Sequence, residues 1–290
     1  MKSTNLSSEE QEQWTEIIEP KRSWLDINIK EIWRYRDLIL LFVKRDFVSV
    51  YKQTILGPIW LIIQPLFTTL IFYFVFNKIA KISTEEVDPT LFYLSGITLW
   101  NYFSECFSKT SNTFVANATI FGKVYFPRLV TPLSIVISNL IKLGVQIVVF
   151  LVVVAYQVYF NGTSIHANSA LLILPLLILL MAVMGLGLGI LFSALTTKYR
   201  DLSFLLTFGI QLLMYATPII YPLSFTSGKL HTVISMNPLT PIIENFRYAF
   251  FGIGQFDLEG LIYTSIFSFT ALILGVIIFN RVEKNFMDTV

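Results

Sequence analysis

The sequence predicts an all-α integral membrane protein with six transmembrane helices. Only 14% of its 290 residues are charged, whereas soluble domains carry about 25%. Its mean hydropathy is +0.67. Apolar segments near the length of about 20 residues that crosses a bilayer recur along the chain. The six expected spans are 58–76, 91–113, 133–160, 170–195, 202–221 and 261–279.

The N-terminal part is expected to comprise a cytoplasmic segment, 1–27, and an amphipathic interface helix, 28–57, ahead of a six-span domain, 58–290. Residues 1–30 contain no apolar core, so we expect no signal peptide there and a first span that acts as its own insertion signal. Trp33 and other apolar residues recur at helical spacing up to residue 52, opposite basic residues. Such a helix lies in the membrane interface rather than across the bilayer. A soluble amphipathic helix is the weaker alternative, because no soluble domain remains to pack on.

The first two spans differ in polarity. Span 58–76 is apolar with an internal break at Pro65, whereas span 91–113 contains Glu105 and Lys109. At i,i+4 spacing with the acid first, these two side chains can pair along one helix face. Ionisable groups at membrane depth usually face protein or water. The pair serves either function or structure, and we favour the structural interpretation.

The loop 117–132, NATIFGKVYFPRLVTP, follows the second span and carries Lys123 and Arg128. These charges predict a cytoplasmic loop by the positive-inside rule. Its prolines set boundaries, so we expect a short helix of about two turns, capped near Asn117 or Thr119. An ordinary polar turn is the alternative. The loop also offers three aromatic side chains for contact: Phe121, Tyr125 and Phe126.

Small and polar residues mark the third and fourth spans. Lys142, close to Asn139, either snorkels towards the inner surface or faces a partner helix. The G-x-G run around Gly185 lies inside an apolar helix and does not follow a strand, which excludes a dinucleotide loop. We interpret Gly185 and Gly189 as a small-xxx-small face for close helix packing.

The segment 223–258 is interrupted by Pro238 and Pro241 and is too short to span twice, yet 242–253 is too apolar for a solvent loop. Two short helices that dip into the outer leaflet fit best. With this topology, fifteen Lys and Arg residues lie inside and four outside. The bias favours both termini inside.

Conventional enzymatic motifs are missing from the sequence. No G-x-x-x-x-G-K-[ST] phosphate loop occurs, His166 and His231 are isolated, and the single cysteine, Cys106, excludes a Cys-rich zinc site. We therefore expect no catalytic residue, metal or cofactor on this chain.

Aromatic residues crowd the first two spans. Most fit interfacial belts, but a subset that faces a pore would suit stacking on sugar rings. The candidates are Trp60, Phe67, Tyr73, Trp100, Tyr102 and Phe103.

Four ordered blocks carry a family resemblance. They are RDFVSVYKQTILGPIW (45–60) followed by QPL, NATIFGKVYFPR (117–128), KYRD (198–201) leading to PIIYP (218–222), and NPLTPIIENFR (237–247). Together they resemble the membrane subunits of polysaccharide-exporting ABC transporters, the bacterial exporters of O-antigen, capsule and teichoic acid. The resemblance extends over roughly residues 30–285 and is specific for the family but not for its substrate.

The resemblance implies a homodimeric permease in the bacterial cytoplasmic membrane, with both termini cytoplasmic and two copies of a separate ATPase that binds ATP and magnesium. It implies an interface helix at 28–52, a coupling helix at 117–127 seated in the ATPase, and an outer gate at 223–254. The expected coupling residues are Asn117, Phe121, Lys123, Tyr125, Phe126 and Arg128. Those expected at the substrate headgroup are Arg45, Tyr51 and Lys52. Those of the outer gate are Tyr221, Pro238, Glu244 and Arg247.

Two other functions stay open. A drug or lipid exporter of the same superfamily would keep the mechanism and change the cargo. A membrane enzyme acting on lipid-linked sugars, such as a polymerase or ligase, usually needs a large outer loop with catalytic acids or arginines. The outer loops here are short, and only Glu244, Arg247 and Asp257 are concentrated candidates.

Overall fold

The computed structural model describes residues 29–52, 56–163, 165–199 and 201–285, and within them it leaves the side chains of residues 29, 50, 51, 198 and 283–285 undescribed. These residues form helices, turns and loops, without a strand. The helices are α1 (Ile29–Arg34), α2 (Arg36–Tyr51), η1 (Gly57–Ile59), α3 (Trp60–Phe72), η2 (Tyr73–Ile79), α4 (Pro89–Ser111), α5 (Thr113–Phe121), α6 (Val130–Asn161), η3 (Ser169–Ile173), α7 (Leu174–Lys198), α8 (Leu202–Tyr215), η4 (Leu223–Phe225), α9 (Gly228–Ser235), α10 (Thr240–Phe251) and α11 (Leu258–Asn285).

Four helical segments among the described residues are long and apolar enough to cross a membrane. They are Gly57–Ile79, Val130–Asn161, Ser169–Thr197 and Leu258–Val282. They correspond to the first, third, fourth and sixth expected spans.

The other two expected spans form helices of a different character. Helix α4 is long enough to cross but more polar, and residues 91–100 are all buried because it packs against α3, α6, α7, α8 and α10. Helix α8 ends at Tyr215 and not at Tyr221 as expected. Pro218 lacks a backbone N–H and disfavours helix at the preceding residue, which accounts for an end in this region.

Glycines allow α7 to lie close to two neighbours. A Cβ added at Gly185 would come within 2.9 Å of Cys106 Cβ on α4, and Gly189 faces Thr110 one turn further along α4. The expected small-residue face is therefore confirmed. On the opposite face, a Cβ at Gly187 would meet the backbone N of Leu272 on α11 at 2.5 Å. The G-x-G-x-G run thus serves two helix interfaces.

The predicted interface helix is two helices and not one. The chain leaves helical geometry at Tyr35, between α1 and α2. Helix α2 packs on α6 through Phe42 and Val43, which are buried, and Ser138 Oγ donates to the carbonyl oxygen of Val43 at 3.4 Å. Large apolar side chains on other parts of α1 and α2 are exposed, namely Trp33, Leu40, Leu41 and Val48.

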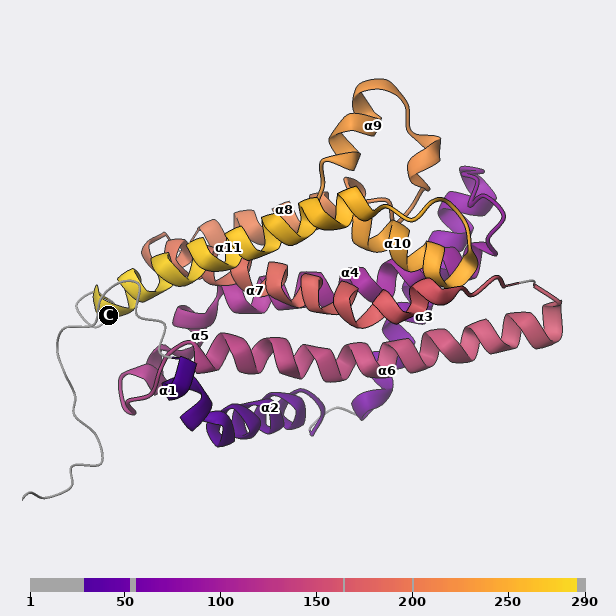
Figure 1. The fold of residues 1–290 in the computed structure, drawn as a ribbon. Helices are drawn as coiled ribbons and strands as arrows, with labels where there is room; N and C mark the ends of the chain where they lie inside the picture. Colours follow the sequence, from indigo (N-terminus) through magenta and orange to yellow (C-terminus); the bar gives the residue numbers. More distant parts are fainter. Residues whose placement is uncertain (1–28, 53–55, 164, 200, 286–290) are drawn as a thin grey trace, which may run out of the picture.

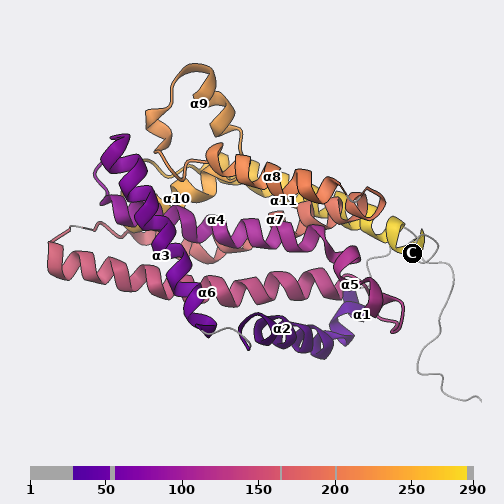
Figure 2. The same ribbon diagram turned by 180° about the vertical axis from the view of Figure 1, so that it is seen from behind.

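The helices run between two ends of the molecule (Figures 1 and 2). Helices α1 and α5 and the C-terminal end of α11 gather at one end, whereas α9 and α10 lie towards the other. This arrangement places the loop between α5 and α6 and the segment 223–258 at opposite ends, as the sequence predicts.

Candidate functional site

The loop between α4 and α6 begins with an interrupted helix. Helix α5 ends at Phe121, and Asn117 within it has non-helical angles (φ −115°, ψ 15°). The Asn117 side chain donates to the carbonyl oxygen of Thr113 at 2.9 Å and is buried. The prediction of a helix over 117–127 is therefore wrong in its bounds, and Asn117 does not present a contact surface. Such side chain–backbone bonds compete with regular helix geometry.

Two of the three loop aromatics are buried. Phe121 and Phe126 are each 4% exposed, and the Phe126 ring contacts those of Phe42 and Phe121 at centroid distances of 5.6 and 5.7 Å. These two side chains were expected to contact a partner; within this chain they are covered, and through Phe42 they anchor the loop to α2. Arg128 lies over the Phe121 ring at 5.5 Å and is half-buried. The exposed residues of the loop include Lys123, Val124 and Tyr125, the last 55% exposed.

The predicted headgroup residues lie at the end of α2. Arg45 forms a two-pronged contact with Asp46, at 2.9 Å from Nε and 2.7 Å from Nη2, and also lies over the Phe42 ring at 4.5 Å. The guanidinium charge of Arg45 is therefore already paired with the Asp46 carboxylate. Lys52 is exposed. The side chain of Tyr51 lies outside the described residues.

The six candidate channel aromatics fall into two groups. Trp100, Tyr102 and Phe103 on α4, which were expected to line a pore, are buried in the core of this chain. Trp60 and Phe67 on α3 are exposed, seven residues apart and therefore on one helix face. Tyr73 is half-buried, with Lys78 Nζ 5.2 Å from its ring centroid.

Two short helices follow α8, as expected, but only one is embedded. Helix α9 projects from the body and is mostly exposed (Figure 1), with Ile234 its one buried residue. Most of α10 is buried against α4, α7 and α11. Pro238, between them, accepts a hydrogen bond at its carbonyl from Thr264 Oγ1 on α11 at 2.9 Å.

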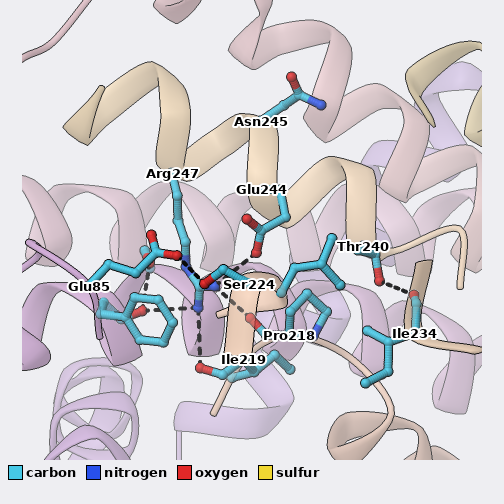
Figure 3. Close-up of polar contacts among 12 residues, drawn as sticks. Glu85, Pro218, Ile219, Ser224, Ile234, Thr240, Glu244, Asn245 and Arg247 are labelled. Carbon is cyan, nitrogen blue, oxygen red and sulfur yellow. Dashed lines mark hydrogen bonds and ion pairs between the residues drawn. The ribbon is translucent and has the colours of Figure 1, made fainter. Parts of the chain in front are cut away.

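Arg247 on α10 ties three segments together at this end (Figure 3). Its Nη1 donates to the carbonyl oxygen of Pro218 at 2.6 Å, and its Nη2 to those of Ile219 at 3.2 Å and Phe92 at 3.4 Å. The guanidinium also lies over the Phe92 ring at 3.6 Å. Glu244, one turn earlier, accepts a hydrogen bond from Nη1 at 3.3 Å. Arg247 therefore fixes the segment after α8 to α4 and α10.

The surroundings of Arg247 are mixed in polarity. The Arg247 side chain is buried, and this burial lowers the pKa of the guanidinium whereas Glu244 raises it. Burial raises the pKa of the Glu244 carboxyl, and the nearby guanidinium opposes this effect. Ser224 on η4 donates to Glu85, which precedes α4, and this bond adds a second link across the segment (Figure 3). Tyr221 is half-buried, and its hydroxyl donates to the carbonyl oxygen of Tyr215 at 2.7 Å.

The expected pair on α4 is a triad. Glu105 Oε2 lies 2.5 Å from Lys109 Nζ and 2.7 Å from Lys142 Nζ on α6. Of the two roles considered for Lys142, the structure shows that it faces a partner helix. Sequence reasoning missed this link, because no local spacing connects residues 37 positions apart.

Residues 37–251 match the sequence profile of the family described as ABC-2 type transporter. This match covers most of the chain, from α2 to α10. The chain belongs to the ABC-2 type transporter family.

Relatives of this ABC-2 type chain match it over nearly their whole length. The O-antigen export system permease protein RfbA of Klebsiella pneumoniae is 30% identical over 255 residues, 87% of this chain and 94% of that protein. The protein of the same name from Myxococcus xanthus is 22% identical, over 90% of this chain and 98% of that protein. The polysialic acid transport protein KpsM of Escherichia coli is 24% identical, over 83% and 91%. The α5–α6 loop and Arg247 both lie within the matched part of this ABC-2 type transporter.

Proposed function

We propose that the chain is the permease half of an ATP-driven exporter that moves a lipid-linked polysaccharide, of O-antigen or capsule type, outwards across the bacterial cytoplasmic membrane. The observation that carries this proposal is the match to the O-antigen permease of Klebsiella pneumoniae, over 94% of that protein. In the proposed assembly, two copies of the chain pair with two copies of an ATPase, which binds ATP and magnesium.

The topology of the proposal has six spans: η1–α3–η2, α4, α6, α7, α8 and α11. Helix α8 has 14 residues and covers about 21 Å, which is less than the roughly 30 Å of a hydrocarbon core. Residues 217–220 continue from it and are buried, and Arg247 satisfies two of their carbonyl groups. Irregular backbone at membrane depth is tolerated when protein shelters it in this way. The segment 216–222 therefore completes the fifth span.

The α5–α6 loop is the proposed contact with the ATPase. Its exposed residues, Lys123, Val124 and Tyr125, supply charge and apolar area. Its buried rings, Phe121 and Phe126, pack in one cluster with Phe42 of α2 and other phenylalanines. Packed interiors transmit displacement and deform little. This cluster joins the loop to α2, α6, α7 and α11, and α5 follows α4 after a single residue. A push on the loop is therefore proposed to tilt α4 and α6 together with α2, as the rigid-body transition that opens the channel.

The exposed aromatic face of α3 is the proposed channel surface. Trp60 and Phe67 leave flat rings uncovered on one face. Rings of this kind suit stacking against the apolar faces of sugars, and a second copy of the chain would enclose them.

The decisive experiment is transport by proteoliposomes that contain the chain and its ATPase, measured with a fluorescent lipid-linked oligosaccharide. We expect transport that requires ATP, magnesium and both proteins. Movement of the unglycosylated lipid at the same rate would favour a lipid exporter. Conversion of the cargo by the chain alone would favour an enzyme, and either result would refute the proposal.

A pair of tyrosine variants tests the contact surface. Tyr125→Ala removes an exposed ring from the α5–α6 loop, and Tyr159→Ala removes one from the opposite end of α6. We expect the first to lower ATP-dependent export at least fivefold and the second to leave it within twofold. Equal effects would refute the assignment of the loop.

A further inference from the structure

The triad on α4 and α6 contains more positive than negative charge. One carboxylate oxygen, Glu105 Oε2, lies within 2.7 Å of two ammonium groups, those of Lys109 and Lys142. A structural ion pair would need only one of them. The second ammonium therefore lacks a counter-charge within the triad.

The charged residues that the structure describes on neighbouring helices do not neutralise this excess. A cavity of about 170 Å³ adjoins the triad and is lined by Asp46 and Ser49 of α2, Lys109 of α4, and Ser138, Asn139 and Lys142 of α6. Asp46 is already paired with Arg45 at 2.7 Å. The described charged groups at and next to the cavity are thus the cations Arg45, Lys109 and Lys142 and the anions Asp46 and Glu105, which leaves one net positive charge.

Burial makes the unmatched charge significant. The side chain of Lys142 is only 10% exposed, so it does not snorkel to water, whereas that of Lys109 is 45% exposed. Charges in membrane segments normally pair with one another or line an aqueous pathway. The cavity is far larger than the about 10–15 Å³ that a single water needs. It can therefore hold an anionic group in contact with both ammonium groups.

The position of Lys109 lets a ligand reach the triad from the surface of the protein. On the α8 side, Lys109 and Glu105 also line a more open cavity of about 220 Å³, together with Ser108 of α4 and Thr207 and Gln211 of α8. Lys109 thus stands between the open cavity and the one beneath α2. It also lies two residues before the C-terminal end of α4, which is the end that leads into the α5–α6 loop.

We propose that Lys109 and Lys142 form a binding site for a phosphate or diphosphate group, and that the Glu105 carboxylate partly neutralises the two ammonium groups and so competes with the ligand. Lysine binds phosphate as a point charge, and two of them around one anion give the site its selectivity for charge. The source of the ligand, a diphosphate-linked lipid, rests on the proposed function. The site itself does not.

An anion site and a structural triad predict different effects for the same two substitutions. If the triad is structural, Glu105→Gln and Lys109→Gln both break it and act in the same direction. If it binds an anion, Lys109→Gln removes attraction for the ligand, whereas Glu105→Gln removes repulsion. The two variants then change affinity in opposite directions.

The test is binding of farnesyl diphosphate to the purified full-length chain, without ATPase or ATP. We expect Lys109→Gln to weaken binding at least tenfold and Glu105→Gln to tighten it at least threefold. Lys109→Arg, which keeps the charge, should bind within threefold of the natural chain. Lys229→Gln, on the exposed helix α9, should leave affinity unchanged.

Three outcomes would overturn the inference: weaker binding by both triad variants, unchanged binding by Lys109→Gln, or equal binding of farnesol, which lacks the diphosphate. Thermal unfolding of each variant identifies any loss of fold. If Lys109→Gln unfolds, the binding affinity of Lys109→Arg decides whether the charge at this position binds the ligand. If inorganic diphosphate binds as tightly as farnesyl diphosphate, the anion site stands and its lipid source is refuted. Because no transport is measured, failure of the site and failure of the proposed export function are distinguishable.

Discussion

Arg247 provides the sharpest prediction about the end of the molecule that contains α10. Replacement by methionine keeps much of the apolar bulk but removes the guanidinium. The carbonyl groups of Pro218, Ile219 and Phe92 then lose this donor, and Glu244 loses its cation. Each of these groups is close to the 4%-exposed Arg247 side chain, so water has little access to replace it.

The expected cost follows from these contacts. A hydrogen bond to a charged group contributes about 1.5–3 kcal/mol, and removal of one partner of a buried ion pair costs about 3–5 kcal/mol. Neighbouring contributions do not add, and two of the bonds are long, at 3.3 and 3.4 Å. We therefore expect Arg247→Met to lower the free energy of unfolding by about 3–5 kcal/mol.

A double variant separates the two causes. Arg247→Met with Glu244→Gln removes the unpaired carboxylate but leaves the carbonyl groups without a donor, so we expect it to recover only about 1–2 kcal/mol of the loss. The assay is denaturant unfolding of the purified chain in mixed micelles, followed by circular dichroism. Arg34→Met, at an exposed position on α1, is the control and should change stability by less than about 0.5 kcal/mol. Full recovery in the double variant would refute the role of the carbonyl contacts, and a single variant as stable as the control would refute the whole argument.

Two further predictions use the same unfolding assay. Gly187→Ala should destabilise the chain by about 1–3 kcal/mol, because the new Cβ meets the backbone of α11; Gly144→Ala, which faces open space on α6, should stabilise it by up to about 1 kcal/mol through helix propensity. The same sign for both would contradict the close packing of α7 and α11. Phe126→Ala should cost about 3–5 kcal/mol because it empties a buried site, whereas Tyr125→Ala, at an exposed one, should cost less than about 1 kcal/mol. If Phe126→Ala and Tyr125→Ala were equally stable, the inference that Phe126 anchors the loop to α2 would be wrong.

Local chemistry explains why several elements were predictable. Glu105 and Lys109 are four residues apart on one helix, so their contact depends only on helix geometry. The same holds for Gly185 and Gly189, whose spacing places them on one face of α7. The long apolar helices follow from composition and length alone.

Contacts between distant segments were not predictable. The sequence pattern was the same for the buried aromatics, such as Phe103 and Phe126, as for the exposed Phe67, because a phenylalanine in an apolar chain suits either lipid or a protein core. Only the packing of α2, α4 and α6 decides which rings are covered. Several of the expected coupling and channel aromatics are therefore buried within the chain, whereas the glycines lie at the helix contacts that their spacing indicated.

Composition, apolar segment length and basic-residue bias were enough to predict a helical membrane protein with the α5–α6 loop and the segment 223–258 at opposite ends. Each apolar segment must form a helix of bilayer length to satisfy its own backbone in lipid, whatever it packs against. The tertiary structure alone decided that Lys142 joins Glu105 and that Arg247 holds the backbone after α8. Each of these contacts joins segments that the chain separates by many residues. Their geometry depends on how whole helices pack, which no local spacing encodes.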